Sequence, residues 1–173
     1  MSDFIHQRHK PPSDQPGARE LVLACPQLQS TVNLSRLVRS AGCFGVRRMI
    51  VCGRPKLDRD ITRDAVEQVQ LECHRTLPPV LVRLKAEGYQ LVGLEQTTNS
   101  QCIYEFPFPL RTALVIGHER QGITDEVLQL LDHVIEIPLF GVPHALNVAT
   151  AASIAIYEYC RYVGQGGRPS VST

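Results

Sequence analysis

Residues 112–138, with the sequence TALVIGHERQGITDEVLQLLDHVIEIP, define the fold most clearly. The apolar run 112–116 predicts a buried strand that ends in a glycine loop, and Thr124 can cap a short helix that ends near residue 131. A second strand is expected over 134–137, where a proline follows it. A strand, a helix and a strand in this order predict a parallel βαβ unit.

The same alternation extends toward the N-terminus. Further strands are expected over residues 21–25, 48–52 and 89–94. Helices are expected around the apolar stripe 34–41, over 62–71, from Pro78 to a terminating Gly88, and from Asn147 to Arg161. We therefore expect an α/β fold in which a parallel sheet is flanked by helices.

The last of these helices is unusual in composition. Its sequence, NVATAASIAIYEYC over residues 147–160, is rich in alanine and apolar on nearly every side. Such a helix is normally buried on most of its faces. We expect it to pass through the centre of the domain or to lie in a subunit interface.

Composition limits the classes of function. With 18 Lys and Arg against 17 Asp and Glu, the net charge of +1 gives no strong electrostatic case for nucleic acid. The six cysteines form no CxxC pair, so we expect no metal site, and free thiols in a cytoplasmic protein. No apolar run is long enough to span a membrane, and no signal peptide is expected. We interpret residues 1–19 as a flexible arm, 20–163 as one domain and 164–173 as a disordered tail.

Three segments carry candidate chemistry. The first contains Asn33 and Arg39, six positions apart. The second has the pattern Gly117-x-Glu119-x-x-Gly122 after a predicted strand, and the third contains Ile137-Pro138 and Leu146-Asn147. Ligands bind at the carboxyl ends of strands in open parallel sheets, which favours loops 117–122 and 138–147 as the site.

Each segment also has a purely structural interpretation. Asn33 could cap its helix, Arg39 could form a surface ion pair, and a GxExxG loop is often only a turn. His118 and His144 could shuttle protons or be ordinary loop histidines. Arg36 and Arg47 or Arg48 could bind RNA phosphate or simply be surface charges.

Taken together, the segments resemble the SpoU (TrmH-type) branch of the SPOUT methyltransferases. The matching residues are Asn33, Arg39, Phe44 and Gly45, then Gly117, Glu119 and Gly122, then Ile137, Pro138, Gly141, Leu146, Asn147, Val148, Tyr157, Glu158 and Arg161. The resemblance covers about residues 20–162. One position departs from it, because Ala145 stands where the family usually has serine.

The resemblance implies transfer of a methyl group from S-adenosylmethionine to a ribose 2′-hydroxyl of tRNA or rRNA. It implies a homodimer with a trefoil knot near the C-terminus and no need for a metal. The implied catalytic residues are Arg39, Asn33, Glu119 and Asn147. The implied cofactor-binding residues are Leu94, Gly117, Gly122, Ile137 and Leu146.

Two questions stay open at this point. The sequence shows no separate RNA-binding domain, which slightly favours tRNA, because a minimal dimer must recognise its RNA by shape. The main alternative is a non-catalytic RNA-binding dimer that keeps the fold, and Ala145 is its sequence support. No GxGxxG, GxxxxGK[ST] or GxSxG motif supports another nucleotide-binding or hydrolytic enzyme.

Overall fold

A computed structural model describes residues 5, 10–12, 20–142 and 144–166 of the chain. The predicted arm at 1–19 and tail at 164–173 lie largely outside the described residues, so both remain predictions. Among the described helices, none has both the length and the apolar character needed to cross a lipid bilayer.

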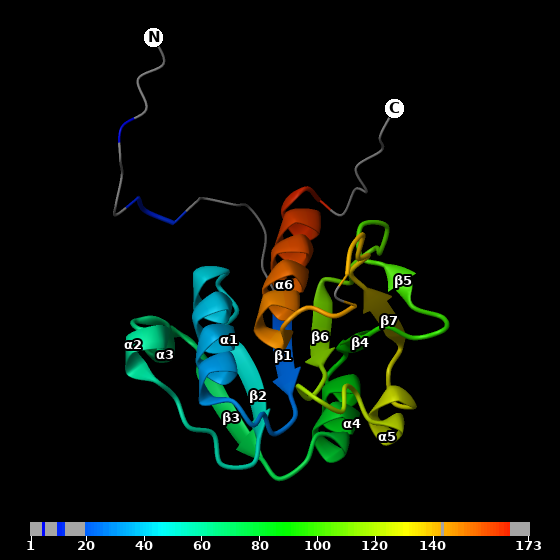
Figure 1. Ribbon diagram of the computed structural model, residues 1–173, viewed down its shortest axis with the longest axis horizontal. Coiled ribbons are helices and arrows are strands. Elements are labelled where there is room, and N and C mark those ends of the chain that lie inside the picture. The colour runs from blue at the N-terminus through cyan, green and yellow to red at the C-terminus, as the bar shows by residue number, and fades with distance from the viewer. Residues whose placement is uncertain (1–4, 6–9, 13–19, 143, 167–173) are drawn as a thin grey trace.

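The centre of the molecule is a seven-stranded sheet in which every pair of neighbouring strands is parallel (Figure 1). The strand order is β3-β2-β1-β6-β4-β7-β5. The strands are β1 (Glu20–Cys25), β2 (Arg48–Cys52), β3 (Gln70–His74), β4 (Gln90–Leu94), β5 (Gln101–Cys102), β6 (Arg111–Ile116) and β7 (His133–Glu136). The predicted parallel α/β architecture is therefore confirmed.

Helices cover both faces of this sheet. They are α1 (Thr31–Cys43), α2 (Arg59–Thr62), α3 (Ala65–Gln68), α4 (Pro78–Ala86), α5 (Asp125–Leu128) and α6 (Val148–Gly164). Helices α1 and α6 lie side by side on one face, and α4 and α5 pack on the other (Figure 1).

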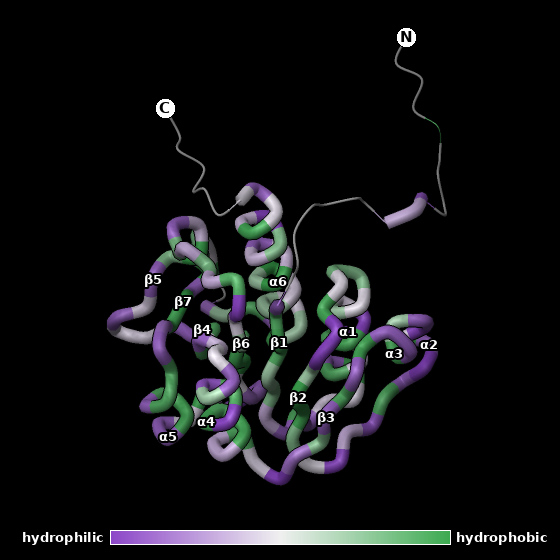
Figure 2. Tube along the Cα trace, turned by 180° about the vertical axis from the view of Figure 1, so that it is seen from behind, coloured by the Kyte–Doolittle hydropathy of each residue, from purple (hydrophilic) through white to green (hydrophobic). Residues whose placement is uncertain are grey.

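Alternating side chains divide each central strand between two hydrophobic cores. In β1, Leu21 and Leu23 join the core under α1 and α6, whereas Val22 and Ala24 join the core under α4 and α5. This period of two is the geometry of a strand buried on both faces. Figure 2 shows the hydrophobic residues of β1 and β2 inside the fold, with hydrophilic residues gathered in the surrounding loops.

Two sequence predictions need correction here. Residues 62–71, predicted as one helix, are split among the end of α2, the short α3 and the start of strand β3. Strand β3 is an edge strand whose side chains are at most partly buried, so it lacks the apolar run that revealed the other strands. The two-residue strand β5 was not predicted either.

The ends of the helices confirm several local predictions and change one. Gly88 follows α4 with φ of +85°, a conformation that glycine adopts at little cost. Thr124 stands at the N-cap position of α5, but its side chain accepts no capping hydrogen bond. Helix α6 packs on one face of the sheet and not through its centre, and Ile154 and Tyr157 are 38% and 57% exposed in the single chain. Its expected place in a subunit interface stays a prediction.

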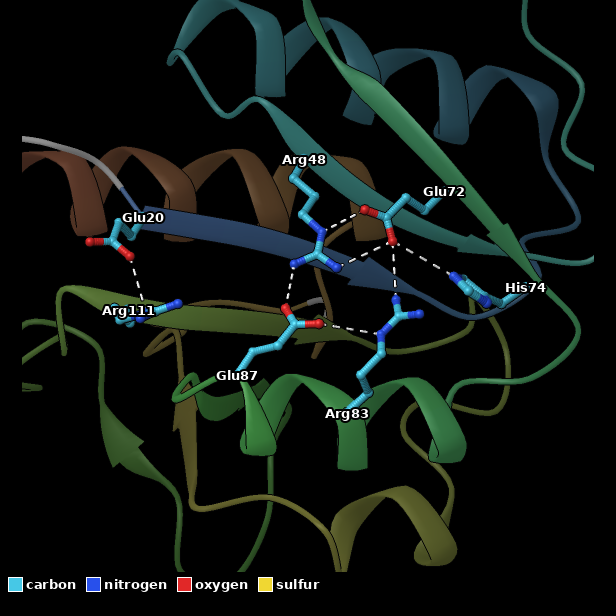
Figure 3. A network of polar contacts seen from close by, with 7 residues as sticks. All are labelled: Glu20, Arg48, Glu72, His74, Arg83, Glu87 and Arg111. Carbon is cyan, nitrogen blue, oxygen red and sulfur yellow. Dashed lines mark hydrogen bonds and ion pairs between the residues drawn. The ribbon is translucent and has the colours of Figure 1, made fainter.

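A network of ion pairs fastens α4 to the edge of the sheet (Figure 3). Arg48 of β2 donates to Glu72 of β3 at 2.6 Å and to Glu87 at 2.8 Å. Arg83 of α4 also bonds Glu72, at 3.1 Å. Glu72 is therefore charge-balanced by two arginines, and it can occupy an edge strand that faces a helix.

Candidate functional site

The loop 117–122 closes tightly on itself after β6. The backbone N–H of His118 donates to the carbonyl of Gly122 at 2.9 Å, and Gly122 returns a bond at 3.0 Å. A side chain on residue 117 would lie 2.8 Å from the backbone of Gly122, so only glycine fits there. The two glycines of the GxExxG pattern therefore let the loop fold back at the carboxyl end of the sheet.

Glu119 joins this loop to the beginning of α1. Its carboxylate accepts hydrogen bonds from the backbone N–H groups of Gln29, at 3.1 Å, and Ser30, at 3.0 Å. It also accepts one from the side-chain amide of Asn33 at 3.3 Å. No described contact links Glu119 to Arg39, so the carboxylate orients the start of the helix and not the arginine.

Asn33 and Asn147 continue the same chain of hydrogen bonds. The Asn147 side-chain nitrogen donates to the Asn33 oxygen at 3.1 Å, and the Asn147 oxygen accepts from the N–H groups of Ala149 and Thr150. A carboxylate only accepts, so Glu119 fixes the orientation of Asn33, and Asn33 in turn fixes Asn147. All three candidate motifs therefore meet in one directional network.

The structure also decides what caps each helix. Ser30, and not Asn33, caps α1 by accepting from the Asn33 N–H at 3.2 Å. Asn147 caps α6. The capping interpretation of Asn33 was therefore wrong, and its side chain is free to link the two helix ends.

The environment of Glu119 favours its charged form. Burial alone would raise the pKa of this carboxyl, but the N–H groups of Ser30 and Gln29, its own N–H and the amide of Asn33 outweigh burial and lower the pKa. Glu119 is therefore ionised at neutral pH and serves as a fixed acceptor.

A cavity of about 240 Å³ opens beside this network. Its wall includes all five residues predicted to bind the cofactor: Leu94, Gly117, Gly122, Ile137 and Leu146. Glu119 also lines it, and Asn33 and Asn147 lie next to it through their bonds to Glu119 and to the start of α6. The ends of strands β4, β6 and β7 and the start of α6 therefore surround this cavity, which we call the first cavity.

Comparison with known proteins settles the family. The model of the SpoU rRNA Methylase family matches residues 20–157, which is most of the chain. This chain belongs to the SpoU methylase family. The family model thus spans all three candidate motifs.

Relatives of this SpoU-family chain include RNA-modifying enzymes. The tRNA (guanosine(18)-2′-O)-methyltransferase of Escherichia coli K12 is 29% identical over 80% of this chain, which spans 62% of that enzyme's length. The crystal structure of the A. aeolicus TrmH/SpoU tRNA modifying enzyme has a TM-score of 0.80 and 28% identity, and the match covers 90% of this chain and 82% of that one. AviRb from Streptomyces viridochromogenes, in complex with AdoMet, shares the fold at TM-score 0.75 and 24% identity, over 88% of this chain and 64% of that one.

Arg39 stands apart from the first cavity of this SpoU-family chain. It lies on the exposed side of α1, where its guanidinium donates to the carbonyl of Ile61 at 3.2 Å. It does not line the cavity. The structure therefore brings Asn33, Glu119 and Asn147 together, but not Arg39.

The structure also places two candidate histidines and one candidate arginine. His118 accepts from the N–H groups of Arg120 and Gln121 through Nδ1, while Nε2 lies 3.7 Å from Glu119. His144 is exposed in the loop before α6. Arg48 is engaged by Glu72 and Glu87, so it is occupied as a structural residue.

Sequence reasoning missed one important residue, Glu95. Its carboxylate accepts from the Ile123 N–H at 3.0 Å and lines the first cavity. A side chain on Gly122, where φ is +66°, would come within 2.5 Å of Glu95. Glu95 directly follows β4, and this position at a strand end was the signal that could have identified it.

Metal binding has no support in the geometry. No group of three or more His, Cys, Asp or Glu side chains is arranged to hold a metal ion within the described residues. All six cysteines carry free thiols.

Proposed function

We propose that this chain transfers a methyl group from S-adenosylmethionine to a ribose 2′-hydroxyl in RNA, with tRNA slightly favoured over rRNA. The observation that carries the proposal is the hydrogen-bond network that joins Asn33, Glu119 and Asn147, one from each motif, beside a cavity at the carboxyl edge of the sheet. The names of the relatives and the family match support the same reaction.

The first cavity fits the chemistry of the methyl donor. Apolar side chains, including Leu94, Ile137 and Leu146, offer surface for an adenine ring. The carboxylates of Glu95, Glu119 and Glu136 also line it, which suits a ligand with a positive sulfonium and ammonium group. The bound donor would supply an already activated methyl group and leave as S-adenosylhomocysteine, and the proton of the ribose hydroxyl would pass to water. The residues of the protein would orient the donor and the acceptor and shield them.

We assign distinct tasks to the predicted catalytic residues. Glu119, Asn33 and Asn147 act as positioning residues, because their bonds fix the starts of α1 and α6 beside the cavity. Arg39, exposed and outside the cavity, meets the RNA. Its guanidinium rarely gives up a proton, so we propose that it clamps a phosphate and stabilises charge developing on the ribose oxygen.

We propose that two copies of the chain form a homodimer. Phe140 and Val142, in the loop before α6, are 91% and 85% exposed, and Ile154 and Tyr157 of α6 are also open to solvent. Exposed apolar side chains of this size favour a protein interface. Sedimentation equilibrium of the wild type against Tyr157→Glu tests this, since a dimer that becomes a monomer only in the variant supports it.

Three further parts of the proposal rest on the family resemblance. They are a trefoil knot formed where the chain reaches α6, one methyltransferase domain over residues 20–163, and a location in the cytoplasm. The match of the family model to 20–157 supports the domain, and the six free thiols suit a reducing compartment.

The decisive experiment is calorimetric titration of the purified chain with S-adenosylhomocysteine, followed by transfer assays with labelled donor on tRNA and rRNA. We expect saturable binding and label in a ribose 2′-O-methyl nucleotide of tRNA. Absence of both binding and transfer would overturn the proposal and favour the non-catalytic RNA-binding dimer.

A further inference from the structure

A second cavity, of about 310 Å³, lies on the opposite side of the loop 117–122 from the first. Its wall is formed by the last residues of β2 and β6, by residues that follow β1, β3 and β6, and by α5. His118 and Gly122 line both cavities, so one loop separates them. An occupant of the second cavity would therefore be a close neighbour of the proposed methyl donor.

This cavity lies at the topological switch point of the sheet. From β1, the chain proceeds outward to β2 and β3 on one side, and then returns to β4 on the other side of β6. In open parallel sheets, the crevice between the two strands where the order reverses is the usual position of a ligand. Pro26 and Gln27, after β1, and Ile116, at the end of β6, line that crevice.

The interior offers apolar surface and the rim offers uncommitted polar groups. Much of the apolar wall consists of Pro26, Leu77, Pro78, Ile116 and Val127. Gln27, Arg75 and Gln121 stand at the rim, and no side-chain hydrogen bond of theirs is found within the described residues. Apolar walls with a few converging polar groups are typical of a site for a small ligand or group.

The side chain of Gln27 lies close to the backbone of Gly53. A side chain on Gly53 would lie 2.6 Å from the side chain of Gln27, and Gly53 has φ of +77°. Because Gly53 has no side chain, the amide of Gln27 can occupy the space beside it. The amide therefore lies beside Gly53 at the exposed edge of the cavity, where it can donate and accept hydrogen bonds.

The charged groups around the second cavity favour an uncharged group inside it over a phosphate group. The start of α4 provides no anion site, because Pro78 and Pro79 have no N–H and Val80 donates to the carbonyl of Leu77. Glu126 also lines the cavity and would repel an anion. The exposed Arg75 can bind a phosphate group that lies outside the cavity.

From these observations we infer that the second cavity binds a nucleobase of the RNA substrate. The base stacks on the apolar wall, the amides of Gln27 and Gln121 bond its edge, and Arg75 meets the adjoining phosphate. Single-stranded RNA is commonly recognised through bases held in this manner. The inference rests on the proposed function, and it adds where the substrate nucleotide or its neighbour is held.

The test is a nuclear magnetic resonance titration of the full ¹⁵N-labelled chain with uridine and guanosine 5′-monophosphates. Saturating S-adenosylhomocysteine blocks the first cavity. Thr76→Trp, at an exposed position of the wall, fills the second cavity, and Val82→Trp is the matched control on an exposed part of α4 outside it. Calorimetry with S-adenosylhomocysteine on the same samples reports separately on the proposed function.

We expect saturable shifts at the amides of Gln121, Ile123 and Val127 in the wild type and in Val82→Trp, and their loss in Thr76→Trp. In transfer assays, Thr76→Trp should raise the KM for RNA about tenfold or more while its affinity for S-adenosylhomocysteine stays unchanged. The inference is overturned if millimolar mononucleotide shifts no resonance around the cavity, or if Thr76→Trp binds as the wild type does. Failure of wild-type S-adenosylhomocysteine binding would instead count against the proposed function alone.

Discussion

The side-chain nitrogen of Asn147 lies 3.1 Å from the side-chain oxygen of Asn33, although 114 positions separate them in the sequence. This bond ties the start of the last helix to the first turn of the first helix. It lies beside the first cavity, whose wall includes residues of the second and third motifs, so its loss should affect both stability and activity.

Replacing Asn147 separates its two tasks. Asn147→Ala removes the cap of α6 and the bond to Asn33, and should cost about 1 kcal/mol of unfolding free energy as well as lowering kcat. Asn147→Asp keeps an acceptor for the helix N–H groups but cannot donate to Asn33, so it should lower kcat with little loss of stability. Urea denaturation and transfer assays measure the two effects. Equal stability losses in the two variants would contradict the capping role.

Glu119→Gln should weaken the fold in a pH-dependent way. The pKa of Glu119 is lowered in the folded chain, so its stabilisation is present above the ordinary carboxyl range and is lost as pH falls through the lowered pKa. At pH 7 the variant should unfold about 1–2 kcal/mol more easily, because a neutral amide replaces an acceptor of three bonds to Gln29, Ser30 and Asn33. As the pH falls through the lowered pKa of Glu119, the difference should shrink. A difference independent of pH would show that shape, and not charge, matters here.

Arg39→Ala should abolish methyl transfer and leave donor binding intact. Arg39 lies outside the first cavity and has one described hydrogen bond, to the carbonyl of Ile61. Loss of a charge that stabilises the transition state costs on the order of 100-fold or more in kcat. Arg39→Lys, which keeps the charge without the planar fork, should retain part of the rate. Turnover near wild type in Arg39→Ala would remove this residue from the mechanism.

Ala145→Ser should raise kcat. Ala145 lines the first cavity and is exposed, so a hydroxyl fits there without repacking the core. The serine would restore the residue type usual in the family, next to the Leu146-Asn147 pair. Single-turnover rates at saturating donor measure the effect. A lower rate would mean that this site has settled on a geometry in which the hydroxyl interferes.

The ion-pair network of Figure 3 offers a matched test of edge-strand stability. A hydrogen bond from Arg48 is the main cause that lowers the pKa of Glu72, so the carboxylate stabilises the fold at neutral pH and loses that effect in acid. Glu72→Gln should cost roughly 1 kcal/mol, less at high salt. Glu20→Gln breaks only the more exposed pair with Arg111 and should cost less than about 0.5 kcal/mol. Equal losses would show that the network adds nothing to single pairs.

The sequence predicted those parts of the molecule that depend on local pattern. Apolar runs revealed β1, β2, β4 and β6, because strands buried on both faces consist almost entirely of apolar residues. Strand β3 was missed because it is an edge strand with no apolar run, and its Glu72 pairs with Arg48 and Arg83 from other elements. No local pattern reports such a partner.

The candidate site shows the same division. Family resemblance placed Leu94, Gly117, Gly122, Ile137 and Leu146 at a donor site, and the structure puts all five around one cavity. It did not reveal that Asn33, Glu119 and Asn147 bond to one another, since their partners are remote in the chain. The second cavity was invisible for the same reason, because it is assembled from the ends of several strands.

The position of α6 as the last element of the fold has a consequence for assembly during synthesis. Strands β1, β2 and β3 leave the ribosome early and can pair, but β1 must wait for β6 before its other edge is covered. The first cavity closes only after α6 has emerged, since Val148 and Ala151 complete its wall. The proposed methyl donor would therefore have no complete site on a nascent chain until nearly all of the domain has been translated, so its binding would stabilise only finished molecules.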